Sequence, residues 1–190
     1  MFKSRHTRQS GFSLLELLLV VGVGALLLLA GLATYRLVTE GNNVNSATQL
    51  LNTMKTQVQR TFQSQGGYDV GSDGDDLVPL LTNAGAFPSG TLNLAGNPID
   101  PWGNTITITQ VGDDGESFAI TLSSLPQSAC LKLGQAFNPV TDPDVAQVDI
   151  GSTSTTNFTP TSTELVSDIS DVDAACSSNP ADNDITYTFY

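Results

Sequence analysis

The 190-residue chain has little of the side-chain chemistry that metal centres and many catalytic sites require. It contains one histidine, His6, and two cysteines, Cys130 and Cys176. A zinc site of cysteine and histidine ligands, or a catalytic triad built on histidine, is hard to assemble from so few residues. We therefore expect a protein that is not an enzyme and that holds no cofactor and no metal ion.

Positive charge is scarce as well. Seven Lys and Arg stand against 19 Asp and Glu, which gives a formal net charge of -12. Phosphate groups are bound by basic surfaces, so we expect no direct contact with nucleic acid. Charged residues make up only 14% of the chain, which excludes a long exposed coiled coil and a highly charged disordered chain.

The few basic residues are concentrated near the N-terminus. Lys3, Arg5 and Arg8 lie within the first ten residues, which contain no acid. Beyond Arg60 the only basic residue is Lys132, against 17 acidic ones. This asymmetry favours a membrane segment joined to an acidic domain outside the cytoplasm.

A long apolar run covers residues 12–35, where Glu16 is the only charged residue. A helix of that length extends about 36 Å, at about 1.5 Å per residue, and can cross the hydrocarbon core of a bilayer. The basic flank is expected to stay in the cytoplasm. The alternative is an ordinary secretory signal, cleaved among the small residues between Ala25 and Ala33.

Glu16 stands at the start of the apolar run. A charged side chain at the edge of a membrane helix is costly, so it marks a candidate functional site. In one interpretation the carboxylate pairs with a cationic group that another subunit supplies. In the other it lies at the depth of the lipid headgroups and simply faces water.

The motif Gly11-Phe12-Ser13-Leu14-Leu15-Glu16 follows a basic segment and precedes about 20 apolar residues. This arrangement resembles the class III signal of type IV prepilins and pseudopilins. The resemblance implies that a membrane peptidase removes residues 1–11 by cutting after Gly11. It further implies that Phe12 becomes the N-methylated first residue, and that Glu16 is needed for assembly through the Phe12 amine of a neighbouring subunit.

The helix is expected to continue beyond the membrane, so that it covers residues 12–65 and stops at Gly66-Gly67. No proline precedes Pro79, and nothing else in this interval forces a break. Apolar residues recur there at helical spacing, which predicts packing against the chain's own domain. They are Ala47, Leu50, Leu51, Met54, Val58 and Phe62.

Residues 66–190 are expected to form a small α+β head domain. Strict alternation predicts a hairpin of strands at 105–111 and 116–123 around a turn at 112–115. The other expectations are a long loop over 66–104 with a short helix near 77–81, a helix at 126–137, strands at 145–150 and 185–190, a loop at 151–163, and a short helix or turn at 172–176.

Cys130 and Cys176 most simply form one disulfide, because the domain is expected to lie outside the cytoplasm. The bond would close a loop of 47 residues, for which the chain-entropy estimate is about 4 kcal/mol of stabilisation. A metal-binding or redox-active pair is the alternative, although the close spacing that such pairs usually show is missing.

Two further motifs lie in the head. The acidic run Asp69–Asp76 suggests calcium, but Gly71 and Leu80 stand where an EF-hand needs ligands, so a solvated acidic loop is the competing interpretation. Asn157-Phe158-Thr159 matches a glycosylation acceptor sequence.

The resemblance to type IV pilins extends into the head. The segment 118–132, with a second cysteine before the last strand, is similar to type IVb pilins, and the turn Asp100-Pro101-Trp102-Gly103-Asn104 is similar to one that precedes the sheet in several pilins. The short leader and Phe12 are those of type IVa subunits, and Ala33 stands where the family commonly has a helix proline. The resemblance implies a long N-terminal helix packed on a small antiparallel sheet with one disulfide.

The function implied is that of a structural subunit of a type IV pilus. The subunit would be stored as a single-pass protein of the inner membrane and then polymerised with its own copies into an extracellular filament. The partners implied are the prepilin peptidase, the pilus assembly machinery and membrane lipid. Two alternatives stay open, a pseudopilin of type II secretion and a membrane-tethered enzyme or binding domain.

Overall fold

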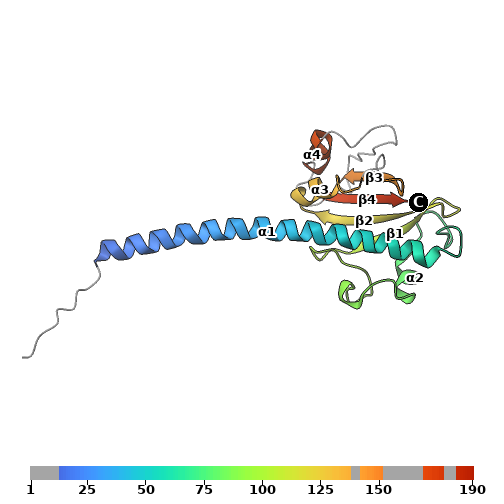
Figure 1. Ribbon diagram of the computed structural model, residues 1–190, viewed down its shortest axis with the longest axis horizontal. Helices are drawn as coiled ribbons and strands as arrows, with labels where there is room; N and C mark the ends of the chain where they lie inside the picture. The colour runs from blue at the N-terminus through green and yellow to red at the C-terminus, as the bar shows by residue number, and fades with distance from the viewer. Residues whose placement is uncertain (1–12, 138–141, 152–168, 178–182) are drawn as a thin grey trace, which may run out of the picture. The chain divides into compact units, whose positions relative to one another are not determined.

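The computed structural model describes residues 13–137, 142–151, 169–177 and 183–190. The chain divides into two compact units, Met1–Thr39 and Glu40–Tyr190. Figure 1 shows the elements in chain order. They are α1 (Leu14–Phe62), α2 (Val78–Asn83), the 3₁₀ turn η1 (Ser89–Thr91), β1 (Ile106–Val111), β2 (Ser117–Leu125), α3 (Gln127–Leu133), β3 (Val145–Gly151), α4 (Ile169–Ser177) and β4 (Asn183–Phe189).

Helix α1 has 49 residues, and its sequence contains no proline. It ends after Phe62 in a turn in which the Gln65 amide donates to the Phe62 carbonyl at 2.9 Å. Gly66 follows with a φ of 77°, a left-handed conformation that favours glycine. The glycines predicted to stop the helix therefore stand just beyond its last turn.

The sheet is antiparallel and has the strand order β1-β2-β4-β3. β1 and β2 form the predicted hairpin, in which Ile108 pairs with Ile120. β4 lies between β2 and β3, and its Tyr187 pairs with Ile120 on one side and Val148 on the other. The last strand in the sequence is thus an inner strand of the sheet.

The two faces of the sheet differ as the alternating strands predict. One face is buried and apolar, and its residues include Ile106, Ile108, Phe118, Ile120, Leu122, Ile185, Tyr187 and Phe189. The other face is rich in threonine, with Thr121 and Thr186 sharing a hydrogen bond of 2.8 Å between their hydroxyls.

The part of α1 that belongs to the head unit packs against the apolar face of the sheet (Figure 1). Its buried apolar residues recur every three or four positions and are Val44, Ala47, Leu51, Met54, Val58 and Phe62. A row of ring contacts crosses the core from Phe62 through Tyr68 and Phe118 to Phe189. The predicted architecture, a long helix packed on a small antiparallel sheet, is confirmed.

The boundaries of several elements differ from their predictions. α3 ends at Leu133 rather than at residue 137, and Gly134 follows it; a side chain there would clash with Ile150 and Val172. α4 is longer than predicted, η1 was not predicted, and α2 begins one residue later than expected. The loop predicted for 151–163 lies, apart from Gly151, outside the described residues, as does the sequon at Asn157.

Candidate functional site

The residues of the predicted processing motif lie at the N-terminal end of α1. Gly11 and Phe12 are outside the described residues. Glu16 lies in the first turn of α1, where its amide donates to the Ser13 carbonyl at 3.0 Å. Its side chain is exposed. A carboxylate in the first turn interacts favourably with the helix dipole, and from this position it is free to meet a partner.

The first unit presents a large apolar surface. Its exposed large apolar side chains include Leu14, Leu15, Leu17, Leu18, Leu19, Val20, Val21, Val23, Leu26, Leu27, Leu28, Leu29, Leu32, Leu37 and Val38. By length and composition α1 can cross a membrane, and none of its most apolar stretch is buried within the molecule. Contiguous apolar surface of this extent is not stable in water and indicates contact with lipid or protein.

The predicted disulfide between Cys130 and Cys176 is present, with 5.9 Å between the Cα atoms. It joins α3 to α4, and both cysteines are fully buried. Gln127 supports the same junction, because its amide nitrogen donates to the Ser177 hydroxyl oxygen at 2.7 Å. Joined in this way, the two sulfurs are not available as thiolate ligands for a metal ion.

α3 is also connected to α1. The Ser128 hydroxyl donates to Oε1 of Glu40 at 2.7 Å, two residues before the disulfide cysteine. Glu40 is the first residue of the head unit. A hydrogen bond to a charged acceptor is among the stronger ones in proteins, so it helps to hold the start of the head's helix against α3.

Lys55 is a core residue that the sequence reading did not identify. Its side chain is only 11% exposed, and its Nζ lies 3.0 Å from Oδ2 of Asp144 and 3.8 Å from Oδ2 of Asp142. The same ammonium lies 5.3 Å from the centre of the Phe189 ring. The available signal was its place in the apolar stripe, next to Met54 and four residues after Leu51. The acids that pair with it could not be inferred from sequence spacing.

Tyr187 is fully buried on the central strand β4. Its hydroxyl donates to the Leu133 carbonyl at 2.7 Å, so it satisfies a main-chain acceptor at the end of α3. Burial raises the pKa of the Tyr187 hydroxyl far above its usual value of 10. The phenol is therefore neutral and serves as a structural donor.

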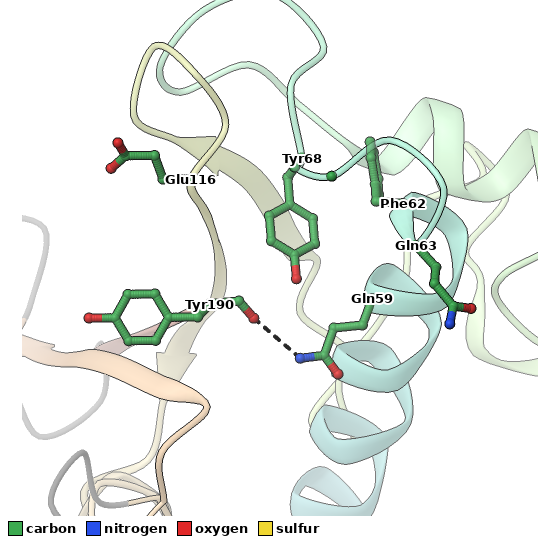
Figure 2. A pocket seen from close by; sticks show the side chains of 8 residues that line it. Gln59, Phe62, Gln63, Tyr68, Glu116 and Tyr190 are labelled. Carbon is green, nitrogen blue, oxygen red and sulfur yellow. Dashed lines mark hydrogen bonds between the residues drawn. The ribbon is translucent and has the colours of Figure 1, made fainter.

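A pocket of about 280 Å³ lies at the C-terminal end of α1 (Figure 2). Eight residues line it: Gln59, Phe62, Gln63, Gly66, Gly67, Tyr68, Glu116 and Tyr190. The Gln59 side chain donates to the main-chain oxygen of Tyr190 at 3.2 Å. Burial raises the pKa of Tyr68, and a hydrogen bond from Gln59 opposes this effect. These residues offer no pairing of a nucleophile with a general base.

The acidic loop uses its carboxylates to shape the backbone. Asp69 accepts from the Gly71 amide, Asp75 from Ser72, Asp76 from Val78, and Asp73 from Gly112 in the β1–β2 turn. Gln110, which is buried, accepts from the Val70 amide at 2.8 Å and joins the same two loops. Among the described residues no group of three or more His, Cys, Asp or Glu side chains is placed to hold a metal ion.

Comparison with protein families gives two matches. The family described as PilS N terminal matches residues 41–190, and the family described as the prokaryotic N-terminal methylation motif matches residues 6–32. The chain is also similar to the toxin coregulated pilin of Vibrio cholerae serotype O1, with 26% identity over 140 residues. The aligned region covers 68% of this chain and 58% of that relative, so the chain spans less than two thirds of its length.

Two crystal structures share the fold. One is TcpA, a type IV pilin from Vibrio cholerae El Tor biotype, with a TM-score of 0.54 and 16% identity, covering 78% of this chain and 99% of that one. The other is a type IVb pilin from Salmonella typhi, with a TM-score of 0.51 and 18% identity, covering 77% of this chain and 97% of that one. At these identities the likeness shows the fold alone.

Proposed function

This chain belongs to the PilS family and is a type IV pilin, and from that premise we propose that it is the structural subunit of a type IV pilus. After leader cleavage the subunit is held in the inner membrane by the apolar part of α1. It is then polymerised with copies of itself into an extracellular filament. The role assigned is mechanical, and it needs no catalytic group and no cofactor.

The observation that carries this proposal is the contrast between covered and uncovered apolar surface. The head unit has its own buried core, whereas the apolar side chains from Leu14 to Val38 are exposed. Lipid covers such a surface in the stored subunit, and helices of other subunits cover it in a filament. An enzyme tethered to the membrane needs the first of these environments but not the second, and it leaves the methylation motif at 6–32 without a role.

Moving this helix from lipid into a filament gains little hydrophobic free energy, since lipid tails are themselves apolar. A polar interaction is then needed to fix the register of neighbouring helices. Glu16 is suited to this purpose when its carboxylate pairs with the Phe12 amine that cleavage after Gly11 creates. The pair is stronger in a low dielectric than in water, and a missing partner leaves one charge buried alone.

Processing is the first test. Intact-mass spectrometry of subunits from sheared filaments should give a chain that begins at Phe12 with one added methyl group. A mature start near Ala33 would identify an ordinary signal peptide and would remove the basis of the proposal.

Glu16→Ala tests assembly. We expect leader cleavage, membrane insertion and head folding to stay intact, while the yield of sheared filaments falls at least tenfold, because the Phe12 amine loses its partner. Glu16→Asp, whose side chain is one methylene shorter, should give an intermediate yield. Subunit levels in the membrane fraction serve as the control, and a normal filament yield from Glu16→Ala would mean that the carboxylate only faces the headgroups.

The pseudopilin of type II secretion is the competing assignment. The Cys130–Cys176 bond supports the pilus subunit, because the major pseudopilins that the N-terminal motif also resembles generally lack such a disulfide. Electron microscopy of the cell surface separates the two, since only the pilus subunit should yield long extracellular filaments at natural expression levels.

A further inference from the structure

Between Glu40 and Arg60 the exposed face of α1 carries no charge. Between Glu40 and Arg60 the one charged residue is Lys55, which is buried in its ion pair. The exposed side chains of this interval are all neutral and polar, namely Asn42, Asn45, Ser46, Gln49, Asn52, Thr53 and Thr56. Exposed helix faces usually carry charged residues, and the lack of them is unexpected in a chain with a net charge of -12.

Five of these residues form a regular row. Asn42, Asn45, Gln49, Asn52 and Thr56 are separated alternately by three and four positions, and every one of them is exposed. This spacing puts side chains on one stripe of a helix and is the spacing by which helices pack in coiled coils. We call these five residues the amide seam.

Few hydrogen bonds within the described part of the chain use the side chains of the seam. Asn52 donates to the Thr48 carbonyl at 3.0 Å, and Thr56 donates to the Asn52 carbonyl at 2.8 Å. Within the described part of the chain no hydrogen bond uses the side-chain amides of Asn42, Asn45 or Gln49. Each such amide offers both donors and an acceptor.

We propose that the amide seam is a contact between subunits, through which α1 of one copy packs against α1 of a neighbouring copy with side-chain amides paired across it. This inference rests on the proposed function, because it concerns a filament built from identical chains. The contact extends the association of helices from the apolar half of α1 into the half that belongs to the head.

A second copy of this chain is the occupant that the chemistry favours. An amide is donor and acceptor at once, so a row of amides is complementary to itself, whereas a row of carboxylates repels its own copy. Lipid is a poor occupant, because amides without partners are costly in hydrocarbon. A cationic partner would be drawn instead to the acidic loop at Asp69–Asp76.

The pattern along α1 supports the same occupant. The seam begins at Asn42, shortly after the apolar run ends at Val38 on the same helix. Copies that associate through their apolar runs therefore bring their seams near one another. Polar residues in such a stripe weaken the association but specify register, so the seam fixes how copies align more than how tightly they hold.

Gln49→Glu tests the seam with the smallest change of shape, because it replaces an amide by a carboxylate on every copy. In a strain that makes filaments from the wild-type chain, we expect the yield of sheared filaments to fall at least tenfold, with membrane subunit levels unchanged. Gln57→Glu is the matched control, since it makes the same change on the same helix at a partly buried residue outside the seam; its yield should stay within twofold of wild type. Gln49→Asn keeps the amide and should assemble.

A thiol placed in the seam gives a second measurement. The described cysteines are both in the disulfide, so Gln49→Cys supplies one reactive thiol. A maleimide should label it at least tenfold more slowly in filaments than in detergent-solubilised subunits, while labelling of Gln57→Cys changes less than threefold.

Two results overturn the inference. The first is a full filament yield from Gln49→Glu together with equal labelling of Gln49→Cys in filaments and in free subunits. This result refutes the seam alone and leaves the proposed function as a pilus subunit standing. A wild-type chain that is cleaved after Gly11 but never forms filaments refutes the proposed function, and the seam with it.

Discussion

The two parts of α1 bury their side chains in different ways. From Leu14 to Thr39 every residue but two is exposed, and the surface is almost wholly apolar. From Glu40 to Phe62 the apolar residues turn inward to the sheet, and the exposed ones are polar. In the first part apolar residues surround the helix, so their spacing does not define one buried face. The second part has the one-sided stripe of a helix in a globular protein.

The difference shows where each part obtains its stability. The second part is held by the chain's own core, because its apolar face is covered by the sheet of the same chain. The first part has no such cover within its own chain, and in the proposed function lipid or other copies supply it. One helix thus combines a segment that is packed within its own chain and a segment that needs other molecules to cover it.

The largest expected effect comes from removing the disulfide, which lies in the head unit and not in the apolar part of α1. In the doubly substituted Cys130→Ser, Cys176→Ser chain we expect the free energy of unfolding of the head to fall by about 4 kcal/mol, because the closed loop of 47 residues is released. Denaturation of the detergent-solubilised chain, followed by near-ultraviolet circular dichroism, measures the change. A midpoint equal to that of the unreduced wild-type chain would contradict the expectation.

A matched pair of leucines sharpens the comparison within α1. Leu51 is fully buried, whereas Leu27 is 69% exposed. Leu51→Ala should lower the free energy of unfolding of the head by about 3 kcal/mol, since it leaves a cavity in the core. Leu27→Ala should change it by less than about 0.5 kcal/mol. Equal losses from both substitutions would show that the apolar run contributes to the stability of the head.

Tyr187→Phe should lower the free energy of unfolding by about 1–3 kcal/mol, because the buried Leu133 carbonyl loses its donor. It also alters the dependence of stability on pH. Burial raises the pKa of Tyr187, so the wild-type head is stabilised below the unfolded pKa of about 10 and loses that contribution as the pH rises above it. Denaturation midpoints between pH 8 and 11 should fall less steeply for Tyr187→Phe than for the wild-type chain.

Local pattern was sufficient for much of the fold. Strict alternation at 105–111 and 116–123 predicts β1 and β2 within two residues, and the apolar spacing from Ala47 to Phe62 predicts the buried face of α1. The cysteine pair predicts the disulfide, since only one pairing exists. The strand and helix predictions each depend on a short segment of sequence, and the disulfide prediction depends on there being only two cysteines.

Contacts between distant segments could not be predicted from local sequence patterns. The pairing of Lys55 with Asp144 joins a helix to a loop about 90 residues later in the sequence, and the strand order places β4 between β2 and β3. Alternation reports which residues of a strand point inward, but not which strand lies beside it. The roles of Gly11, Phe12 and Glu16 depend on other molecules, so they remain predictions for the assembled state.

The inner position of β4 has a consequence for the order of events in the cell. Helix α1 is made well before the strands, but β2 and β3 have no common neighbour until Asn183–Phe189 has been synthesised. The four-stranded sheet therefore cannot close before its last strand has been made. Until then β2 offers an open edge that a folding helper could protect.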